Sequence, residues 1–169
     1  MRPPENVVYF AHGKESGPWG IKIKRLAEVA KAKGCHAQSP DYSSTVDPDK
    51  RVEMLLKLKP EAKKKLVLAG SSMGGYVSAV VSEKVKPSGL FLLAPAFYRA
   101  GYAHPNPKPC AQKILIIHGW DDEVTPVDNS IRYAKEYRTE LYLLKSGHRL
   151  LDVLPEIEKI FAAFLDNIL

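Results

Sequence analysis

One serine lies between two glycines in a segment that could hold a catalytic nucleophile. The pentapeptide G-S-S-M-G (70–74) follows the apolar run 66–69, and residues 76–81 after it could form a helix. A strand, a tight turn and a helix form the arrangement called a nucleophile elbow. The glycines are needed because a side chain two residues before or after the serine would collide with the crossing strand and helix. Ser72 has this flanking pair and Ser71 lacks it, so Ser72 is the candidate nucleophile.

The pentapeptide alone does not establish catalysis, because it also occurs by chance as a small-residue turn between a strand and a helix. A serine hydroxyl is a poor nucleophile at neutral pH and needs a base within hydrogen-bond reach. The base in turn needs an acid that orients it. The rest of the chain must therefore supply both groups.

Candidate acids and a candidate base follow Ser72 in the order, acid then histidine, that such scaffolds use. A turn after the apolar run 114–117 contains three carboxylates, and spacing alone leaves all of them eligible: Asp121, Asp122 and Glu123. His148, in the short loop after the last apolar run, is the expected base. The alternative interpretation is a polar turn with a capping aspartate and an ordinary surface histidine.

The other histidines are weaker candidates for the base. His12 and His118 each precede a glycine at the end of an apolar run, a position suited to shaping a loop. His36 and His104 have no comparable placement. An acyl-transfer site also needs donors for the developing oxyanion, each of which can contribute about 3 kcal/mol. The expected donors are the backbone N–H groups of Met73, next to the nucleophile, and of Lys14, in the loop after the first apolar run.

Short apolar runs alternate with amphipathic segments along the whole chain. This pattern predicts a single α/β domain over residues 1–169, a three-layer α/β/α sandwich with about six mostly parallel strands. In such sheets ligands bind at the carboxyl ends of the strands, where the candidate residues lie. The expected strands are 7–11, 36–40 at an edge, 66–69, 89–95, 114–117 and 141–144. The expected helices are 19–34, a segment through Val52–Leu58 capped by Asp47 or Asp49, one from the elbow to about Pro87, 128–137 and 154–168.

Composition narrows the classes of function. The net charge of +6 comes from basic residues that are dispersed along the chain, so no nucleic-acid partner is expected. No apolar run approaches the roughly 20 residues that cross a bilayer, and the first residues do not resemble a signal peptide. We therefore expect a cytoplasmic protein without membrane contact. Cys35 and Cys110 are expected to be free thiols, and no cluster of ligands suggests a metal.

Four segments together resemble the α/β-hydrolase superfamily, and within it the small cap-less bacterial esterases. They are AHGKESGP after the first run, GSSMGG at the elbow, HGWDDEVTP after a late run and SGH after the last. The third resembles the family's H-G-x-x-D-x-x-x-P turn, and this alignment assigns the acid to Asp122. The segment 96–111 is too short for a helical lid, so the resemblance implies a trimmed fold with an open, shallow pocket.

The resemblance implies a serine hydrolase that cleaves a small carboxylic ester through an acyl-enzyme, with Ser72, His148 and Asp122 as its triad. Neither a cofactor nor a metal is expected, and the partner is a small acyl substrate. A thioesterase, an amidase or peptidase with the same triad, and a non-catalytic binding protein on this fold remain alternatives. Three aromatic residues are pocket candidates, with core packing as an equal alternative: Phe97, Tyr98 and Tyr102.

Overall fold

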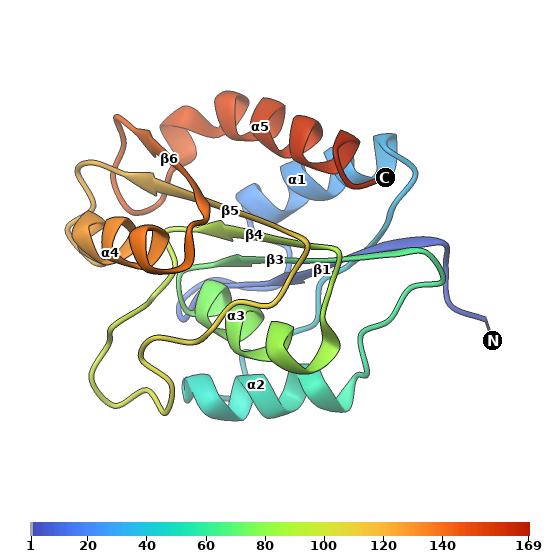
Figure 1. Cartoon of the computed structure of the whole chain (residues 1–169), viewed down its shortest axis with the longest axis horizontal. Coiled ribbons are helices and arrows are strands. Elements are labelled where there is room, and N and C mark those ends of the chain that lie inside the picture. Colours follow the sequence, from blue (N-terminus) through green and yellow to red (C-terminus); the bar gives the residue numbers. More distant parts are fainter. Residues whose placement is uncertain (1) are drawn as a thin grey trace.

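A six-stranded sheet lies at the centre of the computed structural model, which describes residues 2–169 (Figure 1). Every pairing between neighbouring strands is parallel, so the sheet is wholly rather than mostly parallel. The spatial order is β2-β1-β3-β4-β5-β6. The strands are β1 (Asn6–Ala11), β2 (His36–Gln38), β3 (Lys65–Ser71), β4 (Gly89–Leu93), β5 (Lys113–Gly119) and β6 (Glu140–Leu144).

Helices cover both faces of this sheet and give the predicted three layers (Figure 1). One face carries α1 (Ile21–Ala32) and α5 (Leu154–Asp166), preceded by the short 3-10 turn Leu151–Val153. The other carries α2 (Pro48–Lys57), α3 (Met73–Val85) and α4 (Val127–Tyr137). The central strands are therefore buried on both sides, which explains why they are continuous apolar runs rather than alternating ones.

Two apolar clusters, one on each face, hold the layers together. Under α1 and α5, the ring of Phe91 packs against Phe161 and Phe164, with centroids 4.7 and 5.2 Å apart. Under α3 and α4, Phe97 stacks on Tyr133 at 4.0 Å. Burial of such side chains contributes about 1.5–3 kcal/mol each, so the sheet is a rigid platform for its loops.

The strand register brings the candidate segments to one edge of the sheet. Ala11 of β1 lies beside Gly70 of β3, and Ser71 lies beside Leu93 of β4. Gly119 at the end of β5 is paired with Leu144 of β6. Since all strands are parallel, the loops that follow them meet at this edge.

Several local predictions are confirmed and two are wrong. β2 is a short edge strand, and Asp47 caps α2 by accepting hydrogen bonds from the backbone N–H groups of Asp49 and Lys50. The apolar side chains at the start of the predicted helix 19–34 were expected to face the core, but Trp19 and Ile21 are 43% and 59% exposed. The helix begins only at Ile21, so Trp19 precedes it, and Ile21 faces away from the buried row that starts at Ile23.

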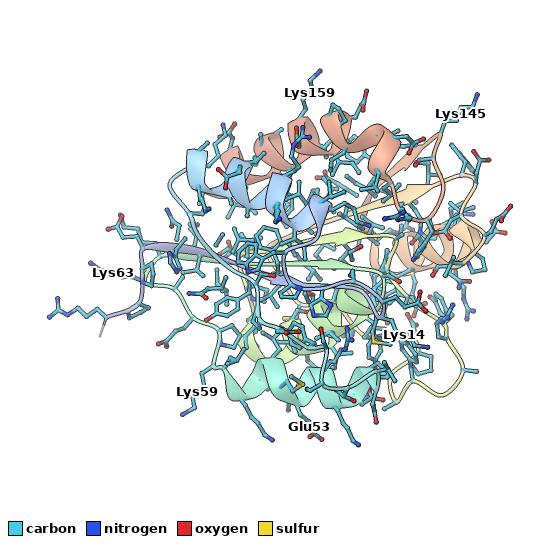
Figure 2. The ribbon with its side chains drawn as sticks, turned by 180° about the vertical axis from the view of Figure 1, so that it is seen from behind. Lys14, Glu53, Lys59, Lys63, Lys145 and Lys159 are labelled. Atoms are coloured by element: carbon cyan, nitrogen blue, oxygen red, sulfur yellow. The ribbon has the colours of Figure 1, made fainter. Side chains whose placement is uncertain are left out.

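The remaining sequence expectations concern charge, membranes and thiols. Lysines project from several sides of the molecule, among them Lys63, Lys145 and Lys159, so positive charge is spread over the face seen in Figure 2. Among residues 2–169, no helix is both long and apolar enough to cross a membrane. Cys35 and Cys110 are both free.

Candidate active site

The turn from β3 into α3 holds Ser72 in a conformation that few side chains adopt. Its backbone has φ 55° and ψ −116°, which is a strained combination for a residue other than glycine. The residues two before and two after it must be glycines. A Cβ on Gly70 would lie 2.1 Å from the carbonyl oxygen of Gly74, and a Cβ on Gly74 would lie 1.9 Å from the carbonyl oxygen of Ala11. The Ser72 N–H donates to Leu93 O at 2.9 Å, which ties the strained turn to β4.

Ser72, His148 and Asp122 form a continuous chain of hydrogen bonds. The distance from Ser72 Oγ to His148 Nε2 is 3.1 Å, and that from His148 Nδ1 to Asp122 Oδ2 is 2.7 Å. A carboxylate can only accept, so the network assigns the ring proton to Nδ1 and leaves Nε2 to accept from the serine hydroxyl. The carboxylate is fully buried, whereas the histidine side chain is 20% exposed and faces the solvent-accessible serine.

Asp122 is the carboxylate that contacts His148, while Asp121 and Glu123 are exposed. Its Oδ1 accepts the backbone N–H groups of Val124 and Thr125, both at 2.8 Å. Burial by itself would raise the pKa of Asp122. The hydrogen bonds from His148 and from these two amides outweigh burial, so the pKa lies below its ordinary value and the group is ionised at neutral pH.

His118 is a second histidine on the same carboxylate, a contact that the sequence analysis did not foresee. Its Nε2 lies 2.9 Å from Asp122 Oδ2 and 3.0 Å from Thr125 O, and its Nδ1 lies 2.7 Å from Ser130 Oγ. Both partners of Nε2 are acceptors, so Nε2 carries the proton and Nδ1 accepts from the Ser130 hydroxyl. Burial lowers the pKa of His118, which favours this neutral form. The His118 ring thus donates to the same Asp122 oxygen that accepts from His148 and helps to hold it in place.

The loop after β1 passes beside the nucleophile. A Cβ on Gly13 would lie 3.7 Å from Ser72 Cβ and 3.4 Å from Ser16 Oγ. His12 is buried, and its Nε2 accepts the Tyr42 N–H at 2.9 Å. Its Nδ1 must therefore be the protonated nitrogen, and it donates to Gly13 O at 2.8 Å.

Arg51 of α2 anchors the same loop through hydrogen bonds to its backbone. The residue is 1% exposed, and its guanidinium donates to three successive carbonyls of the loop: those of His12 at 3.3 Å, Gly13 at 3.0 Å and Lys14 at 3.3 Å. Its Nε donates to Thr45 O at 2.9 Å. Among residues 2–169 it forms no ion pair with a carboxylate, so its charge serves these backbone oxygens.

The direction of the Lys14 amide follows from these bonds. No peptide bond among residues 2–169 is cis, so the Lys14 N–H points opposite to the Gly13 carbonyl in the same peptide plane. That carbonyl accepts hydrogen bonds from Arg51 of α2 and from the His12 ring, and the first of these turns it toward α2. The N–H is therefore turned away from α2. Met73 is the first residue of α3, where a backbone N–H has no partner within the helix.

Sequence reasoning missed Arg51 because a lone arginine in an amphipathic helix is normally solvated. One signal was available: Arg51 lies four residues before Leu55, which puts it on the buried stripe of α2. His118 was considered only as a loop-shaping residue, since no pattern in the sequence shows that its ring meets Asp122.

The three aromatic pocket candidates lie in, or pack against, the apolar cluster under α2, α3 and α4. Phe97 is fully buried and stacks on Tyr133, so it belongs to the core. Tyr98 lies under the guanidinium of Arg132, 4.1 Å from its ring centroid, and Tyr102 packs edge-on against Tyr76 at 4.7 Å. The segment 94–112 contains no helix or strand, and it starts at the site, because the Ala96 N–H donates to Ser72 O at 3.0 Å.

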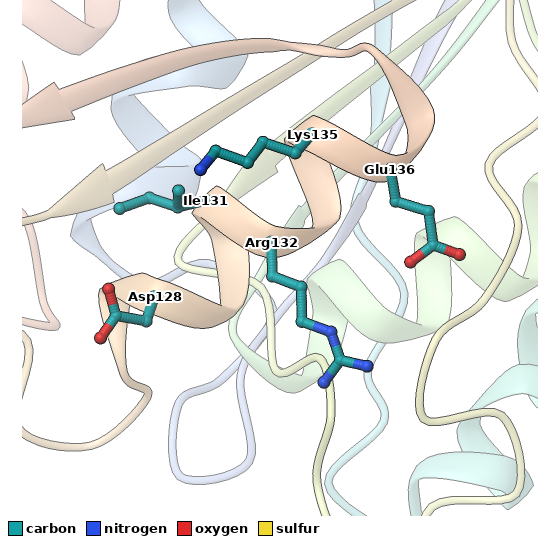
Figure 3. A pocket seen from close by; sticks show the side chains of 5 residues that line it. All are labelled: Asp128, Ile131, Arg132, Lys135 and Glu136. Atoms are coloured by element: carbon teal, nitrogen blue, oxygen red, sulfur yellow. The ribbon is translucent and has the colours of Figure 1, made fainter.

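A hollow of about 550 Å³ lies elsewhere, over the exposed side of α4 (Figure 3). The residues that line it include none of those around Ser72, so it is not part of this site. They are Asp128, Ile131, Arg132, Lys135 and Glu136. No group of three or more His, Cys, Asp or Glu side chains suited to a metal is found within residues 2–169.

The amino-acid sequence matches a model of a known protein family. Residues 6–108 match a family model described as "Uncharacterised protein family (UPF0227)". The chain belongs to this family. The matched part includes Ser72 and the loop after β1 but ends before Asp122 and His148. No curated protein matches the chain.

Solved structures extend the likeness of this UPF0227 chain over its whole length. A crystal structure from Xanthomonas campestris, described as a candidate hydrolase of the alpha/beta superfamily, is 34% identical with a TM-score of 0.86 and covers 96% of this chain and 99% of its own. A second protein from that organism, an a/b serine hydrolase without lid, is 18% identical with a TM-score of 0.71, covering 98% and 86%. Est1E from Butyrivibrio proteoclasticus is 16% identical with a TM-score of 0.80, covering 98% and 88%. The chain is thus a member of the α/β-hydrolase superfamily, as the sequence motifs indicated.

Proposed function

We propose that this protein is a serine hydrolase that cleaves a small carboxylic ester with Ser72, His148 and Asp122. The observation that carries the proposal is the hydrogen-bond chain from Ser72 Oγ through the His148 ring to the buried Asp122 carboxylate. The names of similar structures, a candidate hydrolase and a Pyrococcus furiosus esterase among them, support the same chemistry.

The reaction starts with transfer of the Ser72 hydroxyl proton to His148 Nε2 while Oγ bonds to the ester carbonyl carbon. Asp122 keeps the His148 proton on Nδ1 and stabilises the imidazolium that forms. The carbon–oxygen bond to the leaving alcohol then breaks, and His148 returns the proton to that oxygen. A water molecule, deprotonated by the same ring, hydrolyses the acyl-enzyme and releases the carboxylic acid.

The developing oxyanion needs preorganised donors, and we assign the backbone N–H groups of Met73 and Lys14 to this role. Arg51 and His12 act as positioning residues, because together they anchor the Gly13 carbonyl and so set the direction of the Lys14 amide. The neutral His118 donates to Asp122 and so keeps the carboxylate in position to accept from His148. In this mechanism the Lys14 side chain has no part.

The proposal is tested by steady-state hydrolysis of 4-nitrophenyl butyrate, with matched thioester and amide substrates measured in parallel. Ser72→Ala should lower kcat at least about 10⁴-fold, while Ser44→Ala, at an exposed loop position, should keep wild-type activity. The ester should be the best substrate of the three. A Ser72→Ala protein with wild-type turnover would overturn the triad, and a thioester or amide turned over faster than the ester would overturn the assigned substrate class.

A further inference from the structure

A lysine side chain contacts the residue that precedes the proposed nucleophile. Lys22, in the first turn of α1, reaches across to the end of β3, where its Nζ donates to Ser71 Oγ at 3.0 Å. Ser71 immediately precedes Ser72. Because Ser71 Oγ accepts this bond, its own hydroxyl hydrogen remains available to a further acceptor, as do the other hydrogens of the ammonium group.

A second cation, Arg149, directly follows His148 in the loop after β6. Burial, and then the positive charge of Arg149, lower the pKa of Lys22 to about 8. The charge of Asp122 acts in the opposite direction. Lys22 therefore carries a half-buried positive charge that burial and Arg149 both disfavour, and an anion bound beside it would stabilise that charge.

No carboxylate of the described residues lies in direct contact with either cation, so neither Lys22 nor Arg149 forms an ion pair there. Asp122 is the nearby buried carboxylate, but its two oxygens already accept bonds from two histidine rings and two backbone amides. A half-buried ammonium that has no ion-pair partner and contacts the residue before the nucleophile is complementary to an anionic ligand.

We propose that Lys22, Ser71 and Arg149 form a subsite for an anionic oxygen group, a carboxylate or a phosphate, carried by the ester substrate. The inference rests on the proposed esterase function and names its substrate class. The ammonium and the Ser71 hydroxyl are the hydrogen-bond donors to the anion. Arg149, an exposed residue directly after His148, adds a second positive charge. Hydrogen bonds to charged groups of this kind typically change affinity by tenfold or more.

Matched substrates separate charge from shape. The adipate monoester of 4-nitrophenol is compared with its neutral isostere, the 6-methylheptanoate, to place the anion on the acyl side. On the alcohol side, 4-acetoxybenzoate and 4-acetoxyphenyl phosphate are compared with 4-isopropylphenyl acetate, which also distinguishes carboxylate from phosphate. For each pair the quantity measured is the ratio of kcat/KM for the anionic substrate to that for the neutral one.

Lys22→Met and Arg149→Gln should each lower this ratio about tenfold for at least one anionic substrate, and Lys22→Glu should lower it further. Lys145→Met is the control: this lysine is exposed in the same loop, three residues before His148 (Figure 2), and its loss should leave the ratio within about twofold of wild type. A protein that hydrolyses esters with ratios unchanged by Lys22→Met and Arg149→Gln would overturn the subsite and leave the proposed function intact.

A binding measurement keeps the subsite testable without turnover. Monomethyl adipate, 4-acetoxybenzoate and 4-acetoxyphenyl phosphate are titrated by calorimetry into the Ser72→Ala protein and into the Ser72→Ala/Lys22→Met protein. We expect at least one of them to bind the first and to bind the second about tenfold more weakly. Absence of binding for all three, or equal affinity in the two proteins, would overturn the subsite. Absence of ester turnover in the wild type would overturn the proposed function alone.

Discussion

Replacement of Arg51 is the sharpest perturbation of the loop that we assign to the oxyanion hole. Arg51→Met keeps the length and apolar stem of the side chain but removes all four hydrogen bonds to backbone carbonyls. Three of these carbonyls belong to the loop after β1. Met cannot donate, so the loop loses its anchor on α2 while the triad residues keep their own bonds.

The size of the effect can be estimated from the contacts. A full oxyanion-hole donor is worth about 10²–10³ in kcat. Gly13 O keeps its bond from His12 in the variant, so the Lys14 amide is loosened rather than lost. We therefore expect kcat to fall about 10–100-fold with little change in KM, since the interaction is made in the transition state. Loss of the buried bonds should also lower the free energy of unfolding by about 2–4 kcal/mol.

The assay is steady-state hydrolysis of 4-nitrophenyl butyrate well below the melting temperature, with folding checked by circular dichroism. Arg51→Lys, which keeps one or two donors, should give an intermediate kcat and keeps the test possible if Arg51→Met does not fold. Lys50→Met on the exposed side of α2 is the matched control and should match the wild type. A folded Arg51→Met protein with kcat within about threefold of wild type would refute the positioning role and leave Arg51 purely structural.

Three further predictions follow from local geometry. Gly74→Ala should unfold the protein or lower its free energy of unfolding by at least about 4 kcal/mol, because the added Cβ would lie 1.9 Å from Ala11 O. Gly17→Ala, where the added Cβ meets no atom within 4 Å, should change the free energy of unfolding by less than about 1 kcal/mol. Equal effects of the two substitutions in thermal unfolding would contradict the packing argument. Burial lowers the pKa of His118 below its ordinary 6.5, so its stabilising neutral form is lost as pH falls through the folded pKa. The midpoint of urea unfolding of the wild type should thus be lower at pH 5 than at pH 7. The drop should be smaller in His118→Gln, whose amide N–H replaces the Nε2 donor but does not titrate. An equal drop in the wild type and in His118→Gln would contradict this prediction. The charge of Lys22 is lost as pH rises through its pKa of about 8. The preference of the wild type for anionic esters should therefore decline between pH 7 and 9, whereas that of Lys22→Arg should persist. An equal decline in both proteins would show that another group is responsible.

The arrangement of elements was accessible from the sequence because each layer leaves a local pattern. Strands such as β4 are short apolar runs covered on both faces, and α5 carries a regular apolar stripe. The elbow was equally visible, since the glycines at 70 and 74 are required by contacts only 2.1 and 1.9 Å away. Trp19 was misassigned because its apolar character outweighed the glycine that follows it and delays the start of α1.

The parts of the site that depend on contacts between distant segments could not be predicted. Arg51 reaches the loop after β1 from a helix nearly forty residues later, and no spacing rule links them. Spacing also left three acidic residues eligible, and only the resemblance favoured Asp122. In the folded chain that choice has a physical basis, since Asp122 is the carboxylate turned inward onto both histidine rings.

The central claim is that Ser72 is an activated nucleophile, and covalent labelling tests it most directly. The wild-type protein and Ser72→Ala are treated with a fluorophosphonate at neutral pH, and the modified residue is located by mass spectrometry of the peptides. We predict one adduct, on Ser72, that is absent from Ser72→Ala and forms much more slowly in His148→Gln. A wild-type protein that takes no label, or a label that persists in Ser72→Ala, would contradict the account.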